Sequence, residues 1–118
     1  MTEVPIEITN FFLAMQAGSK GGNAMDKVLA DDAVYEEPFS GKTATHHGRE
    51  AVLDVMRAGW LQPLPDMHLE IDRAQTTADE VVIDWTCYSP ALPGGAGRGT
   101  NRFTLRAGKI ARLITTFR

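Results

Sequence analysis

The feature that most constrains this chain is the strand-like patterning that fills its second half. Residues 67–72 alternate strictly between apolar and polar side chains, and a period of two is typical of a strand with one buried face. Residues 80–88 are rich in Val, Ile, Trp and Tyr, and we expect two further strands over 100–105 and 110–117. Turns or glycine-rich connections separate the four segments. The second half of the chain therefore predicts an antiparallel sheet.

The first half predicts three helices and one short strand. We expect the first helix to stop at Gly18, the second to begin at Asn23 and the third to begin near Gly48 or Arg49. Residues 33–37 are interpreted as a strand ended by Pro38, and residues 39–47 as a loop. Apolar residues three and four apart mark the buried face of each helix: Ile8, Phe11, Phe12 and Met15; Met25, Val28 and Leu29; Val52, Val55, Met56 and Trp60.

Helices followed by a meander of strands indicate an α+β fold with the helices on one face of the sheet. A chain of 118 residues is the size of one domain, and we interpret residues 1–118 as a single domain. A strongly twisted sheet can curl around helices. We therefore expect a strongly curved mixed or antiparallel sheet wrapped around the three helices, a cone-shaped barrel that leaves an apolar pocket.

The charge and cysteine content narrow the classes of partner. The net charge is −3 and the pI is near 5.5, which argues against nucleic acid or an anionic membrane as partner. The single cysteine, Cys87, excludes an internal disulfide. The acidic N-terminus lacks the layout of a signal peptide, and no apolar run is long enough to cross a membrane. We therefore expect a cytoplasmic, soluble protein.

Three motifs, in order, resemble ketosteroid isomerases. Residues 29–38, Leu-Ala-Asp-Asp-Ala-Val-Tyr-Glu-Glu-Pro, resemble the second helix and first strand of that family. Residues 48–52, Gly-Arg-Glu-Ala-Val, resemble the opening of its third helix, and residues 108–110, Gly-Lys-Ile, its last hairpin. The chain thus resembles the nuclear transport factor 2-like superfamily, in its ketosteroid isomerase or SnoaL-like polyketide cyclase branch. Because this fold carries isomerases, cyclases, epoxide hydrolases, dehydratases and non-catalytic binders, the resemblance does not single out one activity.

The resemblance implies roles for three positions. The family's general base, the acid before the proline, corresponds to Glu37. Its oxyanion-hole tyrosine corresponds to Phe11, which has no hydroxyl, and its second oxyanion donor corresponds to Asn101, whose amide can donate without a raised pKa. Tyr35 lies two residues before Glu37 and so shares its strand face, where it supplies a replacement hydroxyl or simply packs in the core. The alternative for Glu37 is a solvated carboxylate at the end of a strand.

The remaining candidate residues are apolar or histidine. His46 and His47 are candidates for the pocket mouth, but adjacent histidines do not chelate one ion, so we expect no metal and no cofactor. The glycine-rich segment 94–99 lacks the context of a phosphate-binding loop. The predicted substrate-binding wall consists of Phe11, Met15, Phe39, Met56, Trp60, Trp85, Phe103, Leu113 and Thr115.

These residues predict a cofactor-independent isomerase or lyase that moves a proton on a small hydrophobic carbonyl compound, steroid-like or polyketide-like. The alternative is a non-catalytic module of the same fold that binds hydrophobic small molecules or dimerises, which the loss of the hydroxyl at Phe11 favours. A scaffold designed or evolved for another reaction is a third alternative. Apolar residues such as Val82 and Ile114 on the outer sheet face predict a homodimer.

Overall fold

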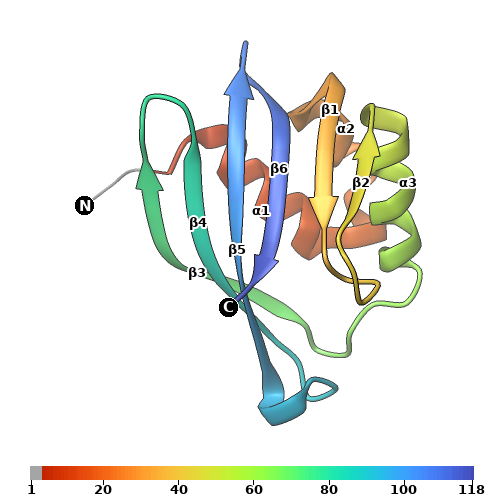
Figure 1. Ribbon diagram of the computed structural model, residues 1–118. Helices are drawn as coiled ribbons and strands as arrows, with labels where there is room; N and C mark the ends of the chain where they lie inside the picture. Colours follow the sequence, from red (N-terminus) through yellow and green to blue (C-terminus); the bar gives the residue numbers. More distant parts are fainter. Residues whose placement is uncertain (1–3) are drawn as a thin grey trace.

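The computed structural model describes residues 4–118 and consists of one layer of helices against one sheet (Figure 1). Two α-helices come first, a pair of strands separates them from the third, and the remaining strands follow the third helix. The elements in order are α1 (Ile6–Ala17), the 3₁₀ turn η1 (Gly18–Gly21), α2 (Ala24–Val28), β1 (Leu29–Glu37), β2 (Ala44–His47), α3 (Arg49–Trp60), β3 (His68–Thr76), β4 (Val81–Tyr88), η2 (Pro93–Gly95), β5 (Ala96–Arg106) and β6 (Lys109–Phe117).

The six strands form one mixed sheet in the order β2-β1-β6-β5-β4-β3. Strands β3 to β6 are the predicted antiparallel meander, whereas β1 pairs with β6 in parallel. Register shifts occur in the β1–β6, β3–β4 and β5–β6 pairings, and such bulges increase the local twist of a sheet. The α+β class and the curved sheet backed by helices are confirmed, but β2 and β3 are free edges, so the sheet does not close into a barrel.

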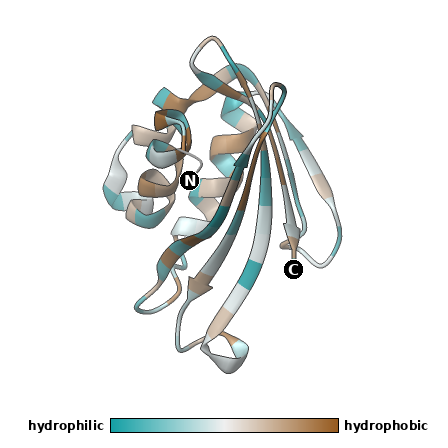
Figure 2. Ribbon diagram, turned by 90° about the vertical axis from the view of Figure 1, so that its left-hand side faces the viewer, coloured by the Kyte–Doolittle hydropathy of each residue, from teal (hydrophilic) through white to brown (hydrophobic). Residues whose placement is uncertain are grey.

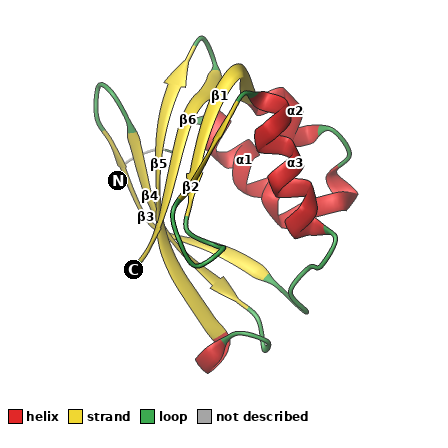
Figure 3. Cartoon of the chain, turned by 45° about the vertical axis from the view of Figure 1, so that its right-hand side comes forward, coloured by secondary structure: helices red, strands yellow, loops and turns green. Residues whose placement is uncertain are grey.

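All three α-helices lie on the same side of the sheet (Figure 3). Helix α1 ends at Ala17, immediately before Gly18, as the sequence predicts. The backbone of Gly18 has a φ of 55° and its N–H donates to the carbonyl of Ala14, a conformation that glycine adopts without a steric penalty. Along the strands, apolar residues alternate with polar ones (Figure 2), so only one face of the sheet is apolar enough to hold the helices.

Three predicted boundaries are wrong. The segment interpreted as a loop over 39–47 contains strand β2, which was missed because an edge strand of only four residues carries little periodicity. Strand β1 begins at Leu29, so Leu29 is a strand residue and not part of the second helix. Strand β5 begins at Ala96 and takes in residues 96–99, most of the glycine-rich segment that was interpreted as a connection.

The core lies where α1 and α3 meet the middle of the sheet. Phe11 of α1 packs edge-to-face on Phe103 of β5 with ring centroids 5.1 Å apart, a favourable arrangement for aromatic pairs. Ile8, Leu53 and Leu113 complete the centre of this cluster and are almost fully buried. The core thereby fixes α1 and α3 on one half of the sheet, while the other half curves away beyond them.

Candidate functional site

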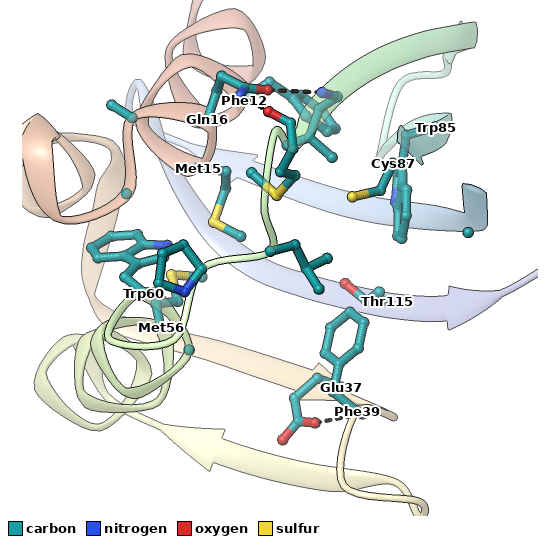
Figure 4. Close-up of a pocket in the computed structure, with 18 of the residues that line it drawn as sticks. Phe12, Met15, Gln16, Glu37, Phe39, Met56, Trp60, Trp85, Cys87 and Thr115 are labelled. Atoms are coloured by element: carbon teal, nitrogen blue, oxygen red, sulfur yellow. Dashed lines mark hydrogen bonds between the residues drawn. The ribbon is translucent and has the colours of Figure 1, made fainter. Parts of the chain in front are cut away.

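A cavity of about 700 Å³ lies between the helices and the curved half of the sheet. Figure 4 shows Met15, Met56 and Trp60 on its helical side and Trp85, Cys87 and Thr115 on its strand side. This volume is within the range of small-molecule sites. Seven of the nine predicted wall residues line it: Phe11, Met15, Phe39, Met56, Trp60, Trp85 and Thr115.

The other two predicted wall residues, Phe103 and Leu113, belong to the core instead. They pair with each other across β5 and β6 and are 0% and 2% exposed. Each lies two residues from a position that does line the cavity, Asn101 on β5 and Thr115 on β6. The face of the strands on which these side chains lie was therefore predicted correctly. The sequence did not show how far along the strands the helix α1 covers that face.

Glu37 ends β1 and lines the cavity with a carboxylate that is almost removed from solvent, since the residue is only 6% exposed. Two donors hold it. The backbone N–H of Phe39 donates to Oε1 at 2.8 Å, and Nε2 of His46 lies 2.8 Å from Oε2. Charge-assisted hydrogen bonds of this kind offset the cost of burying a carboxylate. Both oxygens are thereby oriented, which is what a base of fixed geometry requires.

His46 reaches Glu37 through the pairing of β1 with β2. Tyr35 pairs with His46 and Glu37 pairs with Ala44, so His46 is the diagonal neighbour of Glu37 on the same sheet face, a position from which long side chains meet. The ring is 23% exposed and does not line the cavity. The adjacent His47 pairs with Val34 through the β1–β2 ladder, and its exposed side chain makes no hydrogen bond to residues 4–118. This Glu–His pair was not predicted, because β2 itself was missed.

Asn101 sits in the wall of the cavity with its amide orientation fixed. Nε1 of Trp85 donates to Oδ1 at 3.0 Å, and the Thr115 hydroxyl donates to the same oxygen at 2.7 Å. An indole N–H is only a donor, so the oxygen of the amide must face Trp85. The NH₂ group of Asn101 therefore points away from this pair, and no residue within 4–118 accepts a hydrogen bond from it.

Tyr35 is the third predicted polar residue of the site. It is buried against the cavity, and its hydroxyl interacts with Thr115. Burial, with a smaller contribution from the negative charge of Glu37, raises the pKa of Tyr35 above its ordinary value. The phenol therefore keeps its proton at neutral pH and can act as a hydrogen-bond donor.

Glu37, Thr115 and Asn101 stand in one row on three neighbouring strands. Extending the parallel pair Glu36–Ile114 by one residue places Glu37 beside Thr115, and Thr115 pairs with Asn101. Neighbouring strands are about 4.8 Å apart, so the backbones of Glu37 and Asn101 are separated by roughly 10 Å. Because the three residues are aligned across the sheet, their side chains project from the same face.

Gly99 makes room for the tryptophan that orients this amide. A Cβ at position 99 would lie 2.3 Å from Cζ2 of Trp85 and 2.8 Å from the carbonyl oxygen of Thr116. Only glycine therefore allows the indole to lie flat over β5 at this point. The last residue of the glycine-rich segment is therefore required for packing of Trp85, which the composition of the segment alone did not indicate.

Several residues of the cavity were not predicted. Gln16 of α1 donates from Nε2 to the carbonyl of Met67 at 2.6 Å and accepts from the N–H of Leu69 at 2.8 Å, which ties the start of β3 to the helix. Phe39 and Phe117 form an edge-to-face pair at the rim with centroids 5.4 Å apart. The walls also include Phe12, Leu64, Cys87 and Leu92. Tertiary structure brings these residues together from segments that share no sequence pattern.

Two kinds of feature are absent from the described part of the chain. Residues 4–118 contain no group of three or more His, Cys, Asp or Glu side chains arranged to hold a metal ion. Over the same residues, no helix combines the length and the apolar character needed to cross a membrane.

Solved structures with this fold cover nearly the whole chain. A Sinorhizobium meliloti protein provisionally named a polyketide cyclase is 24% identical, with a TM-score of 0.78 over 96% of this chain and 95% of its own. A Catenulispora acidiphila protein with a ketosteroid isomerase-like fold, solved with trimethylamine, is 19% identical, with a TM-score of 0.78 over 98% of this chain and 87% of its own. A provisional SnoaL-like isomerase from Agrobacterium tumefaciens is 13% identical, with a TM-score of 0.75 over 96% and 95%.

At these identities the similarity establishes the fold and not the activity. No curated protein matches the sequence significantly. The sequence itself matches the SnoaL-like domain over residues 8–113, a range that includes Glu37, His46 and Asn101. This chain therefore belongs to the SnoaL-like domain family of the nuclear transport factor 2-like superfamily.

Proposed function

We propose that this protein is a cofactor-independent isomerase or lyase that transfers a proton on a small hydrophobic carbonyl compound. The observation that carries the proposal is the buried carboxylate of Glu37 on the wall of a largely apolar cavity. Glu37 is the general base, and Asn101 is the donor that stabilises the oxyanion. The reaction class is abstraction of a proton next to a carbonyl group.

The base and the donor divide the reaction between them. Glu37 takes the proton from the carbon next to the carbonyl, and the electron pair of that C–H bond moves toward the carbonyl oxygen. The NH₂ group of Asn101 donates to this oxygen as its negative charge grows. Because the Trp85 indole holds the amide in place, the donor needs no reorganisation during the reaction, which is how a preorganised oxyanion hole lowers a barrier.

The second donor differs from the ketosteroid isomerase pattern. Phe11 packs on Phe103 and has no hydroxyl. The neutral phenol of Tyr35 is the nearest replacement, since it borders the cavity and shares the face of Glu37. In this proposal Tyr35 acts from the sheet side of the substrate, in place of a donor on α1.

A bicyclic β,γ-unsaturated ketone (an octalone) tests the proposal, because isomerisation to the conjugated ketone is followed by its ultraviolet absorbance. We expect Glu37→Gln to lower the rate by about 10²–10⁴, the usual contribution of a positioned proton-transfer group. Glu36→Gln is the matched control, since Glu36 precedes Glu37 but faces the other side of the sheet, where its Oε1 contacts Thr45. Equal rates for Glu37→Gln and Glu36→Gln, or no isomerisation by the unmodified protein, would overturn the proposal.

A non-catalytic binder of hydrophobic small molecules is the second candidate. It is favoured by the engagement of both Glu37 oxygens and by the phenylalanine at position 11. Tight binding of the octalone without turnover, unchanged by Glu37→Gln, would support this candidate over the enzyme.

The proposal includes a homodimer in the cytoplasm, where Cys87 stays reduced. Val82 on β4 and Ile114 on β6 are half-buried on the sheet face opposite the helices. A second copy would cover both. A monomer in light scattering at high concentration would contradict the dimer and leave the proposed chemistry unaffected.

A further inference from the structure

His46 connects the buried carboxylate to solvent. Glu37 lines the cavity and is 6% exposed, whereas the His46 side chain is 23% exposed and lies outside the cavity wall. The two side chains meet at 2.8 Å through Oε2 and Nε2. A continuous path therefore runs from the cavity through the carboxylate and the imidazole to water.

Nothing else in the described structure engages the imidazole in a competing bond. Its only hydrogen-bond partner within residues 4–118 is Glu37, which it meets through Nε2. The ring rests against Tyr35, with centroids 6.1 Å apart and planes tilted by 40°. Nδ1 is thus left to water, and an imidazole that joins a carboxylate at one nitrogen to water at the other is a proton shuttle.

We propose that His46 is a relay that exchanges the proton held by Glu37 with bulk water during turnover. The inference rests on the proposed function of Glu37 as a base. It adds that the proton returned to the substrate comes from solvent and is not the one removed. His46 acts through Glu37 and touches no substrate, so it is a positioning and relay residue.

The relay step balances without an external reactant. The step starts from the tautomer of His46 that carries its proton on Nδ1, so that Nε2 can accept. After Glu37 has taken the substrate proton, its O–H bond breaks as an N–H bond forms at Nε2 of His46. At the same time the N–H bond at Nδ1 breaks and its proton joins a water molecule, so the ring stays neutral. The reverse step delivers a solvent proton to Glu37, which then protonates the product.

Isomerisation of the octalone in D₂O measures the relay directly. The rate comes from absorbance, and deuterium at the newly formed C–H position comes from mass spectrometry. We expect the unmodified protein to place solvent deuterium in most product molecules. In His46→Gln the glutamine amide can donate to Glu37 but cannot relay a proton, and the readout compares deuterium incorporation with turnover whatever the absolute rate. The ratio of deuterium incorporation to turnover should fall about a hundredfold, the low end of a positioned proton-transfer contribution.

His47→Gln is the matched control, because His47 lies next to His46 on β2 and is exposed. It should incorporate deuterium as the unmodified protein does. A second variant, His46→Gly, should regain deuterium incorporation when free imidazole is added, which a purely structural role does not explain.

The outcomes separate the two proposals. Turnover without deuterium in the product, or undiminished incorporation in His46→Gln, would overturn the relay and leave Glu37 as the base. Turnover that survives Glu37→Gln would overturn the proposed function, and the relay with it.

Discussion

Replacing Gly99 by alanine tests whether the position of Trp85 is as constrained as the structure indicates. The added methyl carbon would lie 2.3 Å from Cζ2 and 2.7 Å from Cη2 of the Trp85 ring. Carbon atoms in ordinary contact are about 3.5–4.0 Å apart, so the ring must move by roughly 1.2 Å or more. The hydrogen bond from Trp85 Nε1 to Asn101 Oδ1, now 3.0 Å, would be lost or distorted.

Two effects of Gly99→Ala lower the free energy of unfolding, and a third partly offsets them. Overpacking in a filled site costs about 1–3 kcal/mol, and disturbing the buried hydrogen bond costs about 1–3 kcal/mol. The lower entropy of the unfolded alanine chain returns about 0.4–1 kcal/mol. We therefore predict that Gly99→Ala lowers the free energy of unfolding by roughly 1–5 kcal/mol.

Urea or guanidinium unfolding measures this cost, and Gly97→Ala provides the matched control. Gly97 lies on the same strand, but a Cβ there would meet only Cδ1 of Leu92, at 3.7 Å, an ordinary contact. We expect Gly97→Ala to change the free energy of unfolding by less than about 1 kcal/mol. Gly99→Ala with stability equal to that of Gly97→Ala would refute the reasoning.

A double-mutant cycle with Trp85→Leu identifies the source of the cost. The smaller side chain removes the ring but not the carbonyl oxygen of Thr116, which lies 2.8 Å from the same Cβ. We expect Gly99→Ala to be less damaging in the Trp85→Leu background, with a coupling of about 1–3 kcal/mol. Additive effects of the two substitutions would show that the indole is not the obstacle.

Two further predictions concern titration and reactivity. The Thr86 hydroxyl, helped by the Arg118 guanidinium, lowers the pKa of Asp72. Asp72 therefore stabilises the fold above its unfolded pKa of about 3.9 and loses that contribution as the pH falls through the lower folded pKa. Unfolding measured from pH 6 to pH 2 should show a shallower acid loss for Asp72→Asn, and identical profiles would contradict this. Burial raises the pKa of the Cys87 thiol, and Cys87 lines the cavity. Its reaction with a thiol reagent at pH 8 should be roughly tenfold or more slower in the folded than in the unfolded protein and slower still with an apolar ligand bound. An unchanged rate on unfolding would place the thiol in solvent.

Local patterns were sufficient to predict the elements with strong periodicity. Helix α1 and strands β3, β4 and β6 were expected close to where they lie, because each carries a repeat of 3.6 or 2.0 residues over several turns or pairs. Strand β2 was missed because its four residues have no apolar alternation and are a strand only by virtue of pairing with β1. A strand that is defined only by pairing with a distant segment shows no periodicity in its own residues.

The same division applies to the candidate site. The sequence by itself determined that Tyr35 and Glu37 share one face of a strand, since side-chain direction alternates along a strand, and it left open whether Glu37 points into the pocket or into solvent. It also determined the three helices that cover this face. Only the tertiary structure decided that His46 meets Glu37, that Trp85 fixes the Asn101 amide, and that Phe103 and Leu113 fill the core and leave the cavity to their neighbours. Those outcomes depend on register, strand spacing and the depth to which α1 packs, and these are set by contacts between segments far apart in the chain.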